Sequence, residues 1–274
     1  MNQYNKKLIT HTCPFCLNKA VITKFTNVLK CNKCKIMFQK KDTISDNIAD
    51  IYNIDYFQGK IYKNYFNEES ERKQRFQKKI ELIGNNIPRS GKVLDIGCAA
   101  GFFLKVMKDI GYETYGLDIS SAAYEYIKNY CDIKIFKGDI FEAKYKNNFF
   151  DIISLWDVLE HLINPELVLE EIYRILKSQG ILVIETLNID SWNLKLLKNR
   201  WPLFSHDYHL FYFNTKFLIN LLNKIGFTVI KIFPVQTYLC LKNRTWIIRY
   251  FHRSLLRKFL GRFLDDVILI IASK

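Results

Sequence analysis

The sequence predicts an α/β protein: a doubly wound, mostly parallel sheet of seven strands, preceded by a small cysteine-containing module. Two observations lead to this prediction. From residue 91 to 274, short apolar runs alternate with amphipathic helical segments, a pattern typical of a parallel sheet covered by helices on both faces. Residues 1–41 instead contain two C-x2-C pairs separated by fourteen residues. With 274 residues, the chain is long enough to bury a sizeable core.

The module is predicted to be a zinc ribbon, with Cys13, Cys16, Cys31 and Cys34 as the metal ligands. Each C-x2-C turn presents two thiolates, and two such turns complete a tetrahedral site for Zn²⁺. A segment of this size cannot bury enough core alone, so metal binding would supply its folding free energy. Four sulfur ligands leave no open position, which favours a structural zinc over a catalytic one. Unligated buried or redox-active cysteines are the alternative.

Residues 42–90 are predicted to be a helical connector, with a lid over a ligand site as one role open to its aromatic residues. Phe76, Ile80 and Ile83 recur at helical spacing, and Gly84 follows where the helix should end. Aromatic residues precede this helix at Tyr52, Tyr56, Phe57, Tyr62, Tyr65 and Phe66. They are expected either to cover a ligand site or to pack on a neighbouring element.

The remaining elements alternate between strand and helix over most of the chain. Strands are expected at 92–97, 114–120, 132–140, 149–156, 180–188, 227–233 and 266–274, and helices at 100–112, 121–130, 164–180 and 215–227. Ser120 is placed to cap the second of these helices. Asn164 and Pro165 are placed to begin the third, and Gly180 to end it.

Polar and small residues follow the first three strands, where ligands bind in sheets of this kind. The first strand leads into a loop, 95–101, whose small residues let the backbone turn tightly and approach a ligand. The second strand ends at Asp118, in the position of a carboxylate that meets a ribose hydroxyl pair. The third ends at Asp139, where a carboxylate would lie beside an adenine edge.

Five segments, VLDIGCAAGFF, GLDIS, GDI, FDIISLWDVLEHL and LKSQGILVIETLN, resemble in order and spacing the motifs of class I S-adenosylmethionine-dependent methyltransferases. A nicotinamide dehydrogenase fits less well, because its G-x-G-x-x-G fingerprint is replaced here by Gly-Cys-Ala-Ala-Gly. The resemblance implies an enzyme with the Rossmann-like methyltransferase fold over residues 91–274 and with S-adenosylmethionine as its cofactor.

The resemblance also implies a set of cofactor-binding residues, of which Asp118 would take the ribose hydroxyls and Asp139 the adenine. Leu155 would line the methionine part. Ala99 replaces a frequent glycine, and as a small residue it is expected to be tolerated. The full set is Asp95, Gly97, Cys98, Ala99, Gly101, Asp118, Ile119, Asp139, Ile140, Leu155 and Trp156.

The acceptor side is less specific. The strings DVLEHLINP and HLFYFN resemble small-molecule methyltransferases of bacterial surface-polysaccharide, sugar and quinone pathways, and the motif of enzymes that methylate exocyclic base nitrogens is missing. His161 and His209 are the candidate catalytic bases, with His206 as a further candidate, although each is also open to a packing role. Residues 188–214 are expected to cover the acceptor. Their polar and aromatic side chains are Trp192, Trp201, Phe204, His206, Tyr208, His209 and Tyr212.

The net charge of +14 is concentrated at the two ends of the chain. Residues 1–41 contain nine lysines, residues 242–264 contain seven Lys/Arg, and neither segment has an acidic residue. This distribution suits an anionic partner. A basic amphipathic excursion at 235–265 is expected to contact an anionic membrane surface through 245–264, or to dock as a helix on its own domain.

These observations together predict methyl transfer to a small molecule or glycan, such as a sugar or lipid-linked intermediate of polysaccharide biosynthesis. The alternatives are an rRNA methyltransferase with a zinc-ribbon RNA-binding module, nucleic acid being the less favoured partner, and a non-catalytic binding module. No apolar run reaches about 18 residues, and the amino-terminal residues lack an apolar signal segment. A cytoplasmic location is therefore expected, with peripheral contact to the inner face of the membrane left open.

Overall fold

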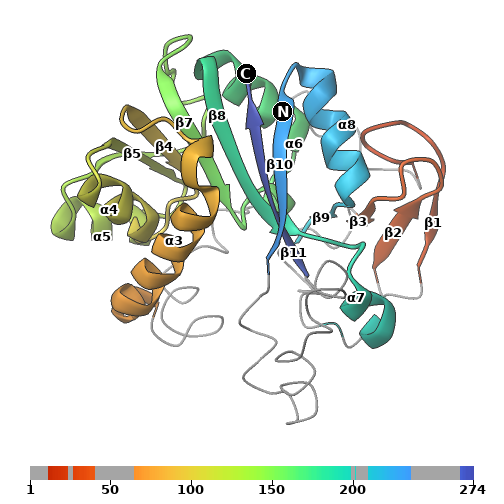
Figure 1. Cartoon of the computed structure of the whole chain (residues 1–274). Helices are drawn as coiled ribbons and strands as arrows, with labels where there is room; N and C mark the ends of the chain where they lie inside the picture. Colours follow the sequence, from red (N-terminus) through yellow and green to blue (C-terminus); the bar gives the residue numbers. More distant parts are fainter. Residues whose placement is uncertain (1–11, 24–26, 41–64, 199–200, 202–208, 236–265) are drawn as a thin grey trace.

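The computed structural model describes residues 12–23, 27–40, 65–198, 201, 209–235 and 266–274 (Figure 1). Seven strands form the main sheet, in the order β10-β11-β8-β7-β4-β5-β6. Their bounds are β4 Lys92–Ile96, β5 Glu113–Asp118, β6 Lys134–Lys137, β7 Phe150–Trp156, β8 Leu176–Leu187, β10 Thr228–Val235 and β11 Val267–Ser273. Strand β11 runs antiparallel to β8 and β10, and the other pairings are parallel. The predicted α/β fold with a mostly parallel sheet is confirmed.

Helices cover both faces of the sheet. The helices on one face are α3 (Glu69–Ile83), α4 (Phe102–Asp109) and α5 (Ser121–Tyr130), and those on the other are α6 (Pro165–Ile175) and α8 (Thr215–Ile225). Neighbouring strand residues take opposite sides: Val93 packs with residues of α4, and Leu94 packs with residues of α6 and α8. This two-residue alternation explains why the strands read as continuous apolar runs, since both faces are buried.

The helix boundaries agree with the sequence signals in most places. The Ser120 hydroxyl accepts a hydrogen bond from the Ala123 amide at 3.3 Å and caps α5, and Pro165 begins α6. The prediction that α6 continues to Gly180 is wrong, because the helix ends at Ile175. Leu176 is already extended and pairs with Phe150 in the sheet, so Gly180 lies inside β8.

The cysteine module is built into the rest of the molecule. Its strands β1 (Ala20–Ile22), β2 (Val28–Cys31) and β3 (Met37–Gln39) form a second sheet, whose fourth strand is β9 (Phe211–Tyr212) from the predicted acceptor-covering segment. Buried residues of the module belong to the same hydrophobic cluster as residues of α6 and α8. Figure 1 shows β1–β3 beside α8 and β9, on the side of the molecule away from α4 and α5.

The acceptor-covering segment differs from its prediction. It includes the short helix α7 (Trp192–Leu197). Trp201 and Tyr212, expected in an aromatic wall, are buried at 2% and 1% exposure. The Trp201 indole donates to the Asp266 carboxylate at 2.7 Å and stabilises the base of the segment. Trp192 is exposed, whereas Phe204, His206 and Tyr208 lie outside the described residues.

Short 3-10 turns complete the described elements: η3 at Tyr65–Glu68, η4 at Gly84–Asn86 and η5 at Leu159–His161. The rings of Tyr65 and Phe66 stack on Phe102 and Tyr126. The other predicted lid aromatics, Tyr52, Tyr56, Phe57 and Tyr62, lie outside the described residues, as does nearly all of the basic excursion.

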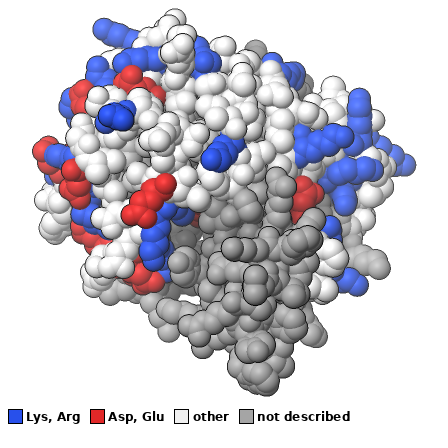
Figure 2. Space-filling model, in the orientation of Figure 1, with Lys and Arg blue, Asp and Glu red and all other residues white. Residues whose placement is uncertain are grey.

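Charge is unevenly spread over the described surface. Figure 2 shows Lys and Arg gathered over the side that carries the cysteine module, and mixed with Asp and Glu on the opposite side. Among the described residues, Lys19, Lys30, Lys33 and Lys35 of the module are exposed. No helix in this described part is both long and apolar enough to cross a bilayer.

Candidate functional site

The loop after β4 is held in a tight left-handed turn. Gly97, Ala99 and Gly101 have φ angles of +69°, +48° and +69°. The Gly97 amide donates to the Leu117 carbonyl at 2.7 Å, which fixes the loop against β5. A Cβ atom added to Gly97 would lie 2.6 Å from Val158 Cγ2. Glycine is therefore strongly favoured at position 97. Ala99 adopts a left-handed conformation that is unfavourable for a residue with a side chain.

Asp118 fastens this loop to the end of β5. Its Oδ2 accepts a hydrogen bond from the Ala99 amide at 2.8 Å, and its Oδ1 accepts one from the Ser120 amide at 2.8 Å. Burial raises the pKa of Asp118, and the two amides act against that shift. Because each carboxylate oxygen has two lone pairs, both can still accept a bond from a ligand hydroxyl.

Asp95 lies at the end of β4 with 3% of its surface exposed. The Ser154 hydroxyl donates to its Oδ1 at 2.6 Å. Burial raises the pKa of Asp95 to about 8, against the opposing effect of Ser154. At neutral pH this carboxyl is mostly protonated, and a positive charge placed next to it would favour ionisation.

The other predicted residues on these strands take different environments. Asp139 is exposed, and its Oδ1 accepts from the Phe141 and Glu142 amides at 2.8 and 2.9 Å. Ile119 is half-buried and Ile140 is buried. Cys98 Sγ points into the core, since a Cβ on Gly116 would lie 2.8 Å from it. Leu155 also packs in the core with no exposed surface, so its side chain does not line the site as expected.

Unsatisfied polar atoms gather at the ends of β7 and β8. Within the described part of the chain, the buried side-chain atoms without a hydrogen-bond partner are Trp156 Nε1, Glu160 Oε1 and Glu185 Oε2. Trp156 and Glu185 are direct neighbours in the sheet, and Glu160 is reached from β8 by the Thr186 hydroxyl, which donates to its Oε2 at 2.8 Å. Buried polar atoms are normally paired, so their concentration at one edge indicates a ligand site.

Helix α3 brings a lysine to this edge. Lys79 Nζ lies 2.6 Å from Glu185 Oε1 and 4.8 Å from the centre of the Trp156 ring. Neither Lys79 nor Glu185 is among the site residues predicted from the sequence. The one available signal was Glu185 itself, an acidic residue inside the otherwise apolar run ILVIETL.

The two predicted histidines lie together although they come from distant segments. His161 belongs to η5 and His209 precedes β9, and their ring centres are 4.8 Å apart. One side-chain oxygen of Glu160 and one ring nitrogen of each histidine all lie within 4.8 Å of one another. Burial raises the pKa of Glu160 to about 8, with a further contribution from Asp157. The arrangement can accept and hold a proton near neutral pH.

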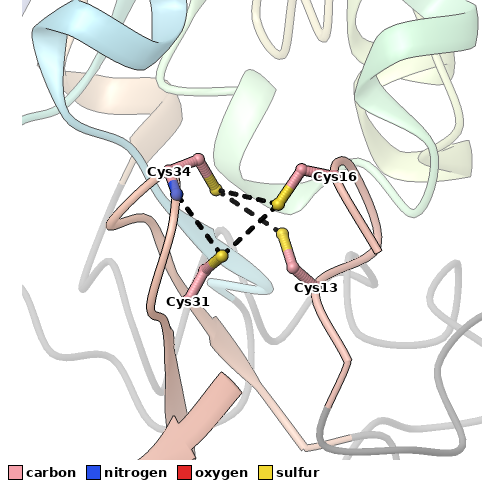
Figure 3. Close-up of side chains that lie close together, drawn as sticks. All are labelled: Cys13, Cys16, Cys31 and Cys34. Atoms are coloured by element: carbon pink, nitrogen blue, oxygen red, sulfur yellow. Dashed lines mark hydrogen bonds between the residues drawn. The ribbon is translucent and has the colours of Figure 1, made fainter. Parts of the chain in front are cut away.

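The four module cysteines converge on one point, as Figure 3 shows. The Sγ atoms of Cys13 and Cys34 are 3.5 Å apart, those of Cys16 and Cys31 3.4 Å, and those of Cys16 and Cys34 3.8 Å. A tetrahedral zinc with sulfurs at about 2.3 Å requires separations of about 3.8 Å. The hydrogen bond with Cys34 lowers the pKa of Cys13 to about 5, which favours its thiolate.

The two C-x2-C turns have matching backbones. The amide that follows each pair, at Leu17 and Lys35, donates to the carbonyl of Cys13 or Cys31, at 3.0 and 3.2 Å. Leu17 and Lys35 both adopt a left-handed conformation, with φ of 59° and 63°. The Cys34 amide also points to Cys31 Sγ at 3.4 Å. These residues fit a four-thiolate metal site in spacing, in donor chemistry and in the amides available to support the sulfurs.

The family of this chain is established by comparison with known proteins. A family model described as a methyltransferase domain matches residues 68–232. The chain belongs to this methyltransferase family. The resemblance to class I S-adenosylmethionine-dependent methyltransferases is thereby confirmed.

Individual relatives match about half of this chain. It is 34% identical over 151 residues to a ubiquinone biosynthesis O-methyltransferase of Bartonella quintana, covering 51% of this chain and 61% of that protein. It is 28% identical over 151 residues to a demethylmenaquinone methyltransferase of Bacillus licheniformis, covering 50% and 64%. The chain thus spans less than two thirds of either relative.

Solved structures agree on the fold. A S-adenosylmethionine-dependent methyltransferase from Archaeoglobus fulgidus superposes with a TM-score of 0.56 at 24% identity, covering 80% of this chain and 97% of that one. At this identity the likeness concerns the fold alone.

Proposed function

We propose that this methyltransferase transfers a methyl group from S-adenosylmethionine to a hydroxyl of a small-molecule acceptor. His161 and His209 meet beside Glu160, and this observation supports the proposal most strongly. The three residues lie at the same edge of the sheet as the loop at Gly97–Gly101. The small-molecule quinone methyltransferases among the relatives support this acceptor class.

On the cofactor side, different residues would bind different parts of the cofactor. The loop at Gly97–Gly101 lets the backbone approach the ligand closely, the indole of Trp156 offers an unpartnered N–H group, and Asp118 offers carboxylate oxygens for the ribose hydroxyls. S-adenosylmethionine supplies, when bound, a methyl group on a positively charged sulfur that is already activated for transfer. The buried carboxyl of Asp95 would then favour that positive charge by ionising.

On the acceptor side, an imidazole would accept the hydroxyl proton as the methyl group leaves the sulfur and bonds to the acceptor oxygen. His209 and His161 are the groups placed for this step, and Glu160 beside them would hold the imidazole ring and stabilise it when protonated. Much of the remaining rate enhancement in such a displacement comes from holding the two reactants in line. The structural elements that hold His209 are therefore as important as the base itself.

The finer acceptor proposal is a sugar or lipid-linked glycan of surface-polysaccharide biosynthesis, which rests on the DVLEHL and HLFYFN strings. Transfer of radiolabelled methyl groups to four substrate sets tests it: phenolic ring compounds, nucleotide sugars, lipid-linked extracts and total ribosomal RNA. Labelling of sugars or lipid-linked glycans would support a glycan acceptor. Labelling of phenolic compounds would instead indicate a quinone-like ring as the acceptor. Stoichiometric labelling of RNA at one position would overturn the small-molecule proposal.

We also propose that Cys13, Cys16, Cys31 and Cys34 hold one structural zinc ion. The sulfur separations and the two matching turns support this assignment. Metal analysis of the purified protein should find one equivalent of zinc, and the four thiols should resist alkylation until a chelator is added. Well under one equivalent, with freely reactive thiols, would contradict the proposal.

Binding of the cofactor can be tested without knowing the acceptor. Calorimetry should detect S-adenosylmethionine binding, with weaker binding by Asp118→Ala. Binding without methyl transfer to any acceptor would favour a non-catalytic binding module that retains the fold.

A further inference from the structure

The backbone that carries His209 is held between two parts of the molecule. The next residue, Leu210, donates its amide to the Glu160 carbonyl at 2.8 Å, on the methyltransferase side. The Leu210 carbonyl accepts from the Gln39 amide at 3.0 Å, on the side of the cysteine module. Strand β9 then continues the pairing with β3, with Phe38 opposite Phe211 and Met37 opposite Tyr212.

Side chains reinforce the module side of this contact. Gln39 is 3% exposed, and its side chain hydrogen-bonds the hydroxyl of buried Tyr212. The Tyr212 ring in turn lies at 90° to the His209 ring, with 5.9 Å between their centres. Gln39 is thus linked to the imidazole through one intervening side chain.

Phe15 makes the second link from within the first cysteine turn. Its ring meets those of Phe217, Phe211 and Phe213 with centres 4.9, 5.3 and 6.3 Å apart. Close by, the Asn214 side-chain amide donates to the Cys34 carbonyl at 2.9 Å. Both cysteine turns therefore contact the chain that follows His209.

We infer that Gln39 and Phe15 are positioning residues for His209, and that the cysteine module assembles the acceptor half of the active site. The inference rests on the proposed function in one respect, that His209 faces the acceptor. It assigns to the module a role in setting the distance between His209 and His161, beyond stabilising the amino-terminal segment.

The cofactor half is built from other elements. Asp118 is bonded to amides of its own strand end and of the loop after β4, and Asp95 is bonded to Ser154 of β7. Lys79 reaches Glu185 from α3. Since these contacts do not involve the module, a change in Gln39 or Phe15 should affect methyl transfer and leave cofactor binding intact.

The experiment compares Gln39→Met, which keeps the volume but loses the bond to Tyr212, with Phe15→Ala and Phe15→Leu. Lys33→Ala, an exposed change in the same module, is the matched control. The readouts are S-adenosylmethionine affinity by calorimetry, the rate constant of methyl transfer, and the imidazole resonances of His161 and His209 by NMR. Zinc content and thermal unfolding show whether each variant is folded.

We expect methyl transfer by Phe15→Ala and Gln39→Met to fall by about 10- to 100-fold, the usual cost of a small misplacement. The cofactor affinity should stay within about twofold, and the resonances of both histidines should move. Phe15→Leu should recover part of the rate, and Lys33→Ala should match the parent protein. Adding Tyr212→Phe to Gln39→Met should cause little further loss, because both changes remove the same bond.

Unchanged histidine resonances in a folded, zinc-containing Phe15→Ala protein would overturn the inference, as would an equal loss of cofactor affinity. The resonances are measured without an acceptor. If no acceptor is methylated, the proposed function fails while the NMR result still decides on the positioning role.

Discussion

Replacing Asp95 by asparagine should change how S-adenosylmethionine affinity depends on pH. Asp95 is buried, and burial raises the pKa of its carboxyl to about 8 in the free protein. A cationic ligand favours the ionised carboxyl and so lowers this pKa. Binding should therefore release a proton, and affinity should increase as the pH rises. Asparagine has nearly the same shape, accepts the same bond from Ser154 and does not titrate.

The size of the change in affinity follows from the difference between the pH of the measurement and the pKa of Asp95. Ionising a carboxyl of pKa about 8 costs about 2.7 kcal/mol at pH 6 and about 1.4 kcal/mol at pH 7. If binding requires the ionised form, affinity should rise about tenfold between these two pH values. Both lie below the range, about pH 7.7–8.0, in which an α-amino group on the ligand would itself titrate.

Calorimetry in two buffers of different ionisation enthalpy measures both the affinity and the protons released. The parent protein should release close to one proton from Asp95 at pH 6.5, and Asp95→Asn should lose that contribution. Asp139→Asn is the matched control: it removes an exposed carboxyl near the proposed adenine position, so it should weaken binding without changing the slope. The same affinity at pH 6 and pH 7 in the parent protein, or an unchanged slope in Asp95→Asn, would refute the reasoning.

Four further outcomes follow from the structure. Gly97→Ala should lower the free energy of unfolding by about 1–3 kcal/mol, because position 97 has a left-handed φ and an added Cβ would clash with Val158. Adding Val158→Ala should recover part of that stability in urea unfolding, and no recovery would show that the clash is not the cause of the loss. Asp118→Ala should weaken S-adenosylmethionine binding by about 1–3 kcal/mol, and unchanged affinity would exclude a ribose contact. Because burial raises the pKa of Glu160 to about 8, the folded state binds more protons than the unfolded state, so stability should decrease from pH 5 to pH 8. Glu160→Gln should reduce that slope in urea unfolding, and an identical slope would contradict the assigned pKa. Cys16→Ser should lower the bound zinc and the melting temperature together, whereas full zinc retention would remove this ligand from the set.

The sequence by itself determined the order of strands and helices and the class of protein. Apolar runs and helical spacing are local properties, and a parallel sheet brings the carboxyl ends of its central strands to one edge. Asp95 and Asp118 could thus be placed together from their positions at strand ends. The tetrahedral grouping of the cysteines was also predictable, because two C-x2-C turns allow few other arrangements. The zinc itself and the roles of the cofactor residues stay predictions.

The tertiary structure decided how distant segments meet. The pairing of β3 with β9 and the meeting of His161 with His209 join segments whose sequences carry no mutual signal, since each depends on packing of the whole core. The same holds for the ion pair of Lys79 with Glu185. The early end of α6 has the same origin: Leu176 gains a partner in the sheet, and this tertiary contact outweighs the local preference that would carry the helix on to Gly180.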